Sequence, residues 1–216
     1  MHISILASIP ALAALLAWPA RRSEAAALWI RLALGGFLAA NELVWYGYRL
    51  STEGFRFPEA LPLQLCDVAL WLTVLSALAL KPWAYELAYF WSVGGSYMAV
   101  LTPDLWEPFP SYPTVYFFLA HGFVVSTILF LAFARLARPR PGSVWRAFFI
   151  LNGYTAAVGL FNFVFNTNYM YLCRKPESAS LLDYLGTWPW YVVSSELVAL
   201  AVFWLLWLPF RRTKPR

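Results

Sequence analysis

The sequence predicts an all-α, polytopic transmembrane helix bundle of about seven helices, organised as a single domain over residues 1–216. Two numbers carry this prediction: 61% of the residues are hydrophobic and only 12% are charged. Soluble domains carry about 25% charged residues, which keep their surfaces hydrated. The low charge therefore indicates that most of the surface faces lipid. The third observation is that the apolar residues fall into segments near the length of about 20 residues that a spanning helix needs.

The predicted spans follow one another along the chain with short connections. They cover residues 3–18, 26–48, 61–80, 84–101, 114–135, 145–166 and 190–210. The first segment is short and contains Pro10, so a signal peptide is an alternative for it. Signal peptides carry basic residues before the apolar stretch. Here Arg21 and Arg22 follow it, which favours a retained helix.

Basic residues are concentrated in one of the two sets of loops. The loops after the first, third, fifth and seventh segments hold Arg21, Arg22, Lys81, Arg135, Arg138, Arg140, Arg211, Arg212, Lys214 and Arg216. The other set holds Arg49, Arg56, Arg174 and Lys175. Cytoplasmic loops carry the excess of Lys and Arg. We therefore expect the N-terminus outside, the C-terminus in the cytoplasm, and a multi-pass protein of the cell (inner) membrane.

The net charge of +5 is spread over these loops and forms no single basic patch. This distribution argues against a nucleic-acid partner and favours contact with membrane lipids. The sequence does not indicate an oligomeric state, and it contains no pattern that calls for a cofactor.

Polar side chains gather at one depth of the predicted bundle, near the ends of the spans that face outside. At a rise of 1.5 Å per residue they lie about 5–12 Å below the outer interface. They are Asn41, Glu42, Gln64, Cys66, Asp67, His121, Asn162, Asn166, Asn168 and Tyr169. Such residues are costly within a span, so their shared depth predicts a site there.

Helical spacing refines this picture. In the sixth segment, one polar face combines Asn152, Thr155, Gly159, Asn162, Asn166 and Tyr169. The third segment is polar on two faces, which predicts a central position in the bundle. In the fourth, a stripe of small residues predicts close packing against a neighbouring helix. This stripe contains Ser92, Gly95, Ser96 and Ala99.

Cys66 and His121 form the candidate catalytic pair, because both fall in the polar layer on different spans. A cysteine acts as a nucleophile in its thiolate form, and a neighbouring histidine can take the thiol proton. Gln64, Asn162 or Asn166 could donate hydrogen bonds to the oxyanion of an acyl-transfer intermediate.

The same residues also fit roles without catalysis. Cys173 lies in the loop after the sixth segment, so a structural Cys66–Cys173 disulfide is an alternative to a free nucleophile. The cysteine could equally be a small packing residue, and the histidine could simply be hydrogen-bonded to a neighbour. No ligand spacing typical of a metal site is present, and none is predicted.

Four strings resemble a known family. They are LPLQLCD at 61–67, FLAH at 118–121, NTNYMYL at 166–172 and LGTWPWY at 185–191. The sequence resembles the YwaF-like bacterial integral membrane family, which is related to the transmembrane protein 164 family. The resemblance implies a multi-pass bundle and a cysteine-dependent acyltransferase acting on phospholipid acyl chains, with Cys66 and His121 at the functional positions. Gln64 departs from this family, which has His there.

Three functions follow as hypotheses. The first is an intramembrane lipid acyltransferase or hydrolase that uses Cys66 and His121. The second is a small-molecule transporter or binding protein, in which Glu42, Asp67 and the asparagines line a polar cavity. The third is a structural membrane protein without catalysis. A polar path through both halves of the membrane would favour transport, and a pocket closed on one side would favour the enzyme.

Overall fold

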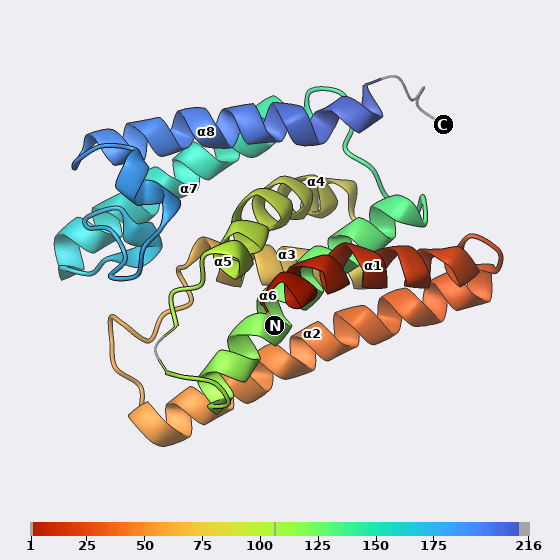
Figure 1. Ribbon diagram of the computed structural model, residues 1–216, viewed down its shortest axis with the longest axis horizontal. Coiled ribbons are helices and arrows are strands. Elements are labelled where there is room, and N and C mark those ends of the chain that lie inside the picture. Colours follow the sequence, from red (N-terminus) through yellow and green to blue (C-terminus); the bar gives the residue numbers. More distant parts are fainter. Residues whose placement is uncertain (1, 106, 212–216) are drawn as a thin grey trace.

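The computed structural model describes residues 2–105 and 107–211, and all regular structure within them is helical (Figure 1). The α-helices are α1 (His2–Ala20), α2 (Glu24–Glu53), α3 (Leu65–Ala79), α4 (Pro82–Trp91), α5 (Tyr97–Leu101), α6 (Tyr112–Phe133), α7 (Ser143–Phe165) and α8 (Trp190–Trp207). A π-helical turn, η1 (Ser92–Ser96), joins α4 to α5, and η2 (Tyr169–Tyr171), η3 (Leu181–Tyr184) and η4 (Leu208–Phe210) are short 3₁₀ turns. The predicted all-α fold is confirmed. The basic tail beyond Arg211 lies outside the described residues.

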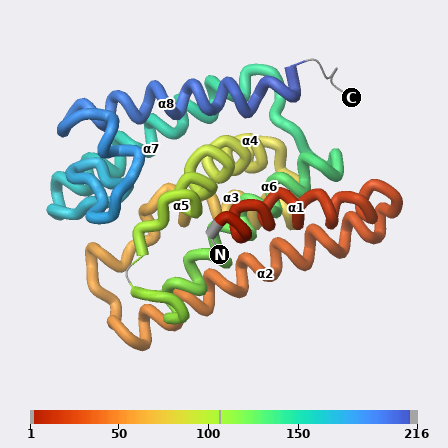
Figure 2. Tube along the Cα trace, viewed as in Figure 1, coloured from red at the N-terminus to blue at the C-terminus, as the bar shows by residue number. Residues whose placement is uncertain are grey.

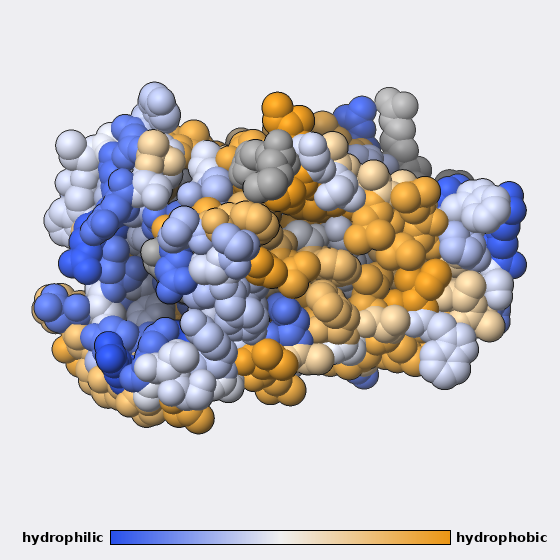
Figure 3. All heavy atoms as spheres, turned by 60° about the horizontal axis from the view of Figure 1, so that its bottom comes forward, coloured by the Kyte–Doolittle hydropathy of each residue, from blue (hydrophilic) through white to orange (hydrophobic). Residues whose placement is uncertain are grey.

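The surface of the bundle is that of a multi-pass membrane protein. Helices α1, α2, α6, α7 and α8 are each long and apolar enough to cross a membrane. The remaining predicted spans are α3, which has 15 residues, and the continuous α4–η1–α5 segment. Figure 3 shows hydrophobic residues over the middle of one face and hydrophilic residues toward both of its ends. Which end faces the cytoplasm stays a prediction.

The helix boundaries follow ordinary capping chemistry. The Ser23 hydroxyl accepts a hydrogen bond from the Ala26 N–H at 3.3 Å and starts α2. Helix α2 ends at Glu53 and is followed by the capping residue Gly54, whose φ of 71° suits a residue without a Cβ. Arg31 of α2 donates to the carbonyls of Ala77 and Leu78 at the end of α3. This bond fixes α2 against α3 and satisfies carbonyls that the helix leaves free.

Helix α3 lies at the centre and contacts α2, α4 and α6, as its two polar faces predict. Helix α1 packs against α6 and α2. Helices α7 and α8 run antiparallel, side by side, and form an outer layer next to α4 (Figures 1 and 2). The connections 54–64, 102–111 and 166–189 lead into α3, α6 and α8, and we call the end of the bundle where they gather the site end.

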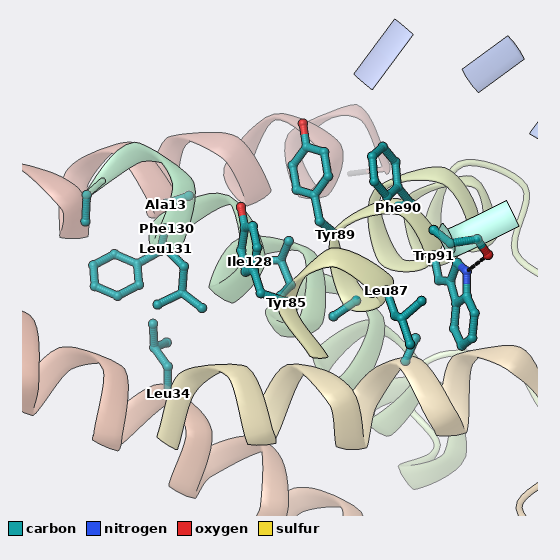
Figure 4. Close-up of a cluster of buried hydrophobic side chains, with 14 of the residues drawn as sticks. Ala13, Leu34, Tyr85, Leu87, Tyr89, Phe90, Trp91, Ile128, Phe130 and Leu131 are labelled. Carbon is teal, nitrogen blue, oxygen red and sulfur yellow. Dashed lines mark hydrogen bonds between the residues drawn. The ribbon is translucent and has the colours of Figure 1, made fainter. Parts of the chain in front are cut away.

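The core is formed mainly by α4 and α6 with contributions from α1 and α2. Tyr85, Phe90, Ile128 and Leu131 have no more than trace exposure to solvent, and Figure 4 shows them among their neighbours. The Trp91 indole N–H donates to the Ala147 carbonyl at 3.3 Å, drawn as a dashed line in Figure 4. This bond ties the end of α4 to α7.

A charged cluster holds the α7–α8 layer at the end opposite the site end. Glu86 of α4 is 3% exposed, and its carboxylate accepts hydrogen bonds from Arg140 and Arg146. The Arg140 backbone N–H and Nε donate to Glu86 Oε1 at 3.0 and 2.7 Å. The hydrogen bond to Glu86 raises the pKa of Arg140 above its ordinary value. The cluster therefore joins α4, the α6–α7 loop and the start of α7.

Candidate functional site

A partly open cavity of about 790 Å³ lies between α3, α6, α8 and the α4–α5 segment, under the site-end loops. Its volume falls within the range of about 300–1,000 Å³ that is usual for ligand sites. Polar residues on the wall include Arg49, Glu53, Glu59, Gln64, Cys66, Asp67, Asp104, His121 and Ser195. Apolar residues include Leu70, Phe90, Val124, Leu151, Val198, Val202 and Phe203. The cavity is thus amphipathic.

Cys66 lies in the first turn of α3, one residue after the helix begins at Leu65. The Asp67 carboxylate accepts from the Gln64 N–H at 3.0 Å, which fixes this turn. The Gln64 side-chain carbonyl accepts from the Met170 N–H at 2.9 Å. Because the Met170 N–H bonds to the oxygen of the Gln64 side-chain amide, the Nε2 group of that amide can donate hydrogen bonds to other acceptors. Gln64, Cys66 and Asp67 all line the cavity.

His121 lies on the face of α6 that lines the cavity, together with Pro113, Tyr116, Phe117, Ala120 and Val124. Its Nδ1 is 2.9 Å from the Phe117 carbonyl oxygen. A carbonyl can only accept, so Nδ1 carries the proton and the Nε2 of the neutral ring has a free lone pair. The Phe117 ring packs against the imidazole with centroids 4.3 Å apart. These contacts fix the orientation of the His121 ring.

Cys66 and His121 line the same cavity from the neighbouring helices α3 and α6. Across residues 2–105 and 107–211, no hydrogen bond joins the thiol to the imidazole. Both residues of the predicted pair thus line one cavity, and no hydrogen bond between them is present in the described residues.

Asn162 at the end of α7 and the two asparagines of the NTNYMYL string stabilise a loop and do not line the cavity. The buried Asn162 side chain accepts from the Tyr169 N–H and the Thr167 hydroxyl, at 2.9 and 2.7 Å. It also donates to the Tyr169 carbonyl at 2.9 Å. Asn166 ends α7 in the left-handed conformation, and Asn168 accepts from the N–H groups of residues 173 and 174. In the polar face predicted on the sixth segment, the Asn162 side chain thus forms its hydrogen bonds within this loop.

Tyr169 links that loop to the cavity. Its hydroxyl donates to the Pro58 carbonyl at 2.8 Å, and its side chain lines the cavity. Burial raises the pKa of Tyr169 above its ordinary value. The loop therefore forms part of the cavity wall, even though Asn162, Asn166 and Asn168 do not.

Replacing Asn162 with alanine is expected to destabilise the protein by about 3 kcal/mol, because two buried backbone groups of Tyr169 lose their partners. Thr167→Val removes one of the three bonds and is expected to cost about 1 kcal/mol. Thermal unfolding in detergent and proteolysis of the 166–189 connection measure both effects. Equal stability of the two variants would contradict this account of the loop.

Glu42 and Asn41 lie behind the cavity wall. Glu42 is inaccessible and accepts a hydrogen bond from the Tyr116 hydroxyl. Among the described residues, Glu42 Oε1 and Asn41 Nδ2 have no hydrogen-bond partner. Neither residue lines the cavity, whereas Tyr116 does. The carboxylate therefore contacts the wall through Tyr116.

The two cysteines are free, so a Cys66–Cys173 disulfide does not match this structure. Cys173 is exposed and lies outside the cavity wall. In the described part of the chain, no three His, Cys, Asp or Glu side chains lie close enough together to hold a metal ion.

The structure adds site residues that the sequence interpretation missed. The Tyr171 hydroxyl donates to the Asp104 carboxylate at 2.8 Å, and both residues line the cavity. Burial and this hydrogen bond raise the pKa of Tyr171. In the small-residue stripe, Gly95, Ser96 and Ala99 also line the cavity. Close packing, the predicted role of that stripe, agrees with the burial of Ser92 and Ser96 and with the contacts of η1 to α3, α6 and α8.

On α4 and α8, the cavity wall extends no farther from the site end than Phe90 and Phe203. Their ring centroids are 5.1 Å apart. Further along the same two helices, the Tyr89 hydroxyl donates to the Leu206 carbonyl at 3.0 Å. The Tyr89 and Phe210 rings pack edge to face at 5.6 Å. These contacts close the interface between α4 and α8 beyond the cavity.

Comparison with known proteins gives one match. A family model described as the TMEM164 family matches residues 1–207. Curated proteins and solved structures give no match. The matched range contains every α-helix of the bundle and all of the cavity wall. The chain belongs to the TMEM164 family.

Proposed function

We propose that this protein is a cysteine-dependent acyltransferase or lipid hydrolase that acts on phospholipid acyl chains, with Cys66 as nucleophile and His121 as base. The observation that carries the proposal is the shared cavity, whose wall contains both side chains. Its mixed polar and apolar lining suits a lipid, which has a polar ester region and a long apolar chain.

The first half of the reaction forms a thioester. His121 Nε2 takes the thiol proton while Cys66 Sγ bonds to the ester carbonyl carbon. The tetrahedral intermediate then collapses, the ester C–O bond breaks, and the leaving lysolipid oxygen takes the proton from His121. In the second half, the hydroxyl of another lysolipid, or water, attacks the thioester and gives its proton to His121. Breaking the C–S bond releases the new ester or the free acid, and the proton returns to sulfur.

The oxyanion needs hydrogen-bond donors close to the nucleophile. The Gln64 Nε2 group is a candidate, since its carbonyl oxygen is already held by Met170. The first N–H groups of α3 are further candidates, because the start of a helix leaves them without an intrahelical acceptor. Asn162 is no longer a candidate, because its amide is committed to the loop.

The absence of a hydrogen bond between Cys66 and His121 among the described residues is compatible with this reaction. Catalytic hydrogen bonds are often long in the absence of substrate and tighten when it binds. A carbonyl group placed between the thiol and the imidazole would bring together the three reacting centres. The Phe117 carbonyl keeps the imidazole in the required tautomer throughout.

Transport is less well supported than acyl transfer. A transporter needs a path through both halves of the membrane, whereas the wall residues on α4 and α8 extend from the site end only as far as Phe90 and Phe203. Glu42, one of the carboxylates expected to line such a path, does not belong to the wall.

The proposal predicts a covalent intermediate. When the purified protein is incubated with an alkyne-tagged phospholipid, we expect a label on the protein that neutral hydroxylamine removes. The label should be lost in Cys66→Ala and retained in Cys173→Ala, which changes a free thiol outside the cavity. Undiminished, hydroxylamine-sensitive labelling of Cys66→Ala would eliminate Cys66 as the nucleophile.

A further inference from the structure

The part of the cavity wall that lies farthest from the site end is mainly apolar, and we call this part of the cavity the limb. Helix α8 contributes Ser195, Val198, Ala199, Val202 and Phe203 to the wall. These residues lie on one helical face, at spacings of three and four. From Ser195 to Phe203 the stripe covers about 12 Å at 1.5 Å per residue. One leaflet of the hydrocarbon core is about 15 Å thick, so this length accommodates most of one acyl chain.

The π-helical turn gives the limb its width on the opposite side. Gly94 and Gly95 of this turn both line the cavity. A Cβ at Gly94 would lie 3.5 Å from the Phe203 ring and 3.5 Å from Val202. A Cβ at Gly95 would lie 3.9 Å from Leu65. Ordinary side chains at these positions would therefore project into space that the limb now occupies.

Phe90 and Phe203 are the wall residues of α4 and α8 that lie farthest from the site end. Gly94 approaches the same Phe203 ring that packs against Phe90, and both aromatic residues are almost completely buried. We call Gly94, Phe90 and Phe203 together the floor of the limb. A chain that enters from the polar end of the cavity would reach these two rings last.

We propose that this limb binds one acyl chain and that Gly94 and Phe203 set the longest chain that fits. The position of the ester group beside Cys66 is taken from the proposed function, and this part of the inference rests on it. The binding site itself depends only on the shape and apolar character of the limb. A methyl group added at Gly94 shortens the limb, and removal of the Phe203 ring lengthens it.

The test uses changes with opposite expected effects. Gly94→Ala and Gly94→Val should weaken binding of the longest chains by about fourfold for each methylene that no longer fits, and leave the shortest unaffected. Phe203→Leu and Phe203→Ala should shift the preference toward longer chains. Gly36→Val and Phe163→Ala are the matched controls, since Gly36 has no neighbour within 4 Å and Phe163 is 84% exposed. Neither control residue lines the cavity.

Two readouts separate this proposal from the catalytic one. The first is binding of diacyl phosphatidylcholines with lauroyl, palmitoyl, stearoyl and arachidoyl chains to the Cys66→Ala protein, measured by native mass spectrometry. The second is the chain-length profile of turnover with Cys66 present. Opposite shifts of the binding profile in the Gly94 and Phe203 variants support the limb, whether or not lipid is turned over. Absence of lipid turnover would contradict only the proposed function. The limb proposal is overturned if turnover depends on Cys66 but its chain-length profile stays the same in the Gly94 and Phe203 variants. It is also overturned if the two control variants shift this profile as much as the Gly94 and Phe203 variants do.

Stability is checked on the same samples. A general loss of folding would lower binding of all chain lengths together, and it would not shift the two sets of variants in opposite directions. Gly94→Ala is the milder change, because its new methyl group would lie at ordinary van der Waals distance from both neighbours. Equal loss at every chain length in Gly94→Ala, with unfolding unchanged, would also contradict the proposal.

Discussion

Lipid turnover by Cys66→Ala is expected to fall to the uncatalysed background, because no other thiol lines the cavity among the described residues. Loss of a nucleophile removes the covalent route completely. His121→Ala is expected to lose about 10²–10⁴-fold, which is the usual contribution of a general base. Release of lysolipid from a labelled phospholipid measures both rates in reconstituted vesicles.

The pair must also behave as a unit. If His121 serves only to activate Cys66, the double variant should be no slower than Cys66→Ala alone. Cys173→Ala should keep wild-type turnover, because its thiol is exposed and lies outside the cavity. Turnover by Cys66→Ala at the wild-type rate would rule out the catalytic proposal.

The second large effect is expected at the Glu86 cluster. Removing both arginine side chains, in Arg140→Ala/Arg146→Ala, would leave a carboxylate that is 3% exposed without a neutralising cation, with the backbone N–H of residue 140 as its remaining donor. Breaking a buried pair in this way costs about 3–5 kcal/mol. The lower end applies, because the arginines themselves are 51% and 44% exposed. The measurement is the free energy of unfolding in detergent.

Substitution of Glu86 should cost less than loss of the arginines, since these half-exposed cations can regain water when the carboxylate is gone. Glu86→Leu in the double-arginine background is therefore expected to restore part of the stability, because it removes the unpaired buried charge. If the triple variant were less stable than the double variant, the unpaired carboxylate would not be the cause of the loss.

Hydropathy was sufficient to locate the helices. All seven predicted spans are helical, and their limits differ from the observed ones by a few residues. The π-turn at Ser92–Ser96 could not be predicted, because its residues also suit a regular helix; only packing shows that they line a cavity. The Glu86 cluster joins residues 54 and 60 positions apart, and no local pattern indicates such a pairing.

The candidate site was predicted in part. Depth along the spans placed Cys66, Gln64, Asp67 and His121 in one layer, and all four line the cavity. Depth does not determine the direction in which a side chain points. Asn162 was predicted in the same layer, but its side chain accepts a hydrogen bond from the backbone of Tyr169. Glu42 accepts a hydrogen bond from the Tyr116 hydroxyl. A turn that needs hydrogen-bond partners competes with a site for the same amides.

The order of the helices has a consequence for biogenesis. One wall of the cavity comes from α8, which is the last long helix of the chain. Insertion into the membrane proceeds from the N-terminus during synthesis. The thiol of α3 and the imidazole of α6 are therefore in place before the wall that encloses them exists. A ribosome-bound chain halted before residue 190 therefore has the thiol and the imidazole without the α8 wall, so the cavity is enclosed only after α8 has been inserted.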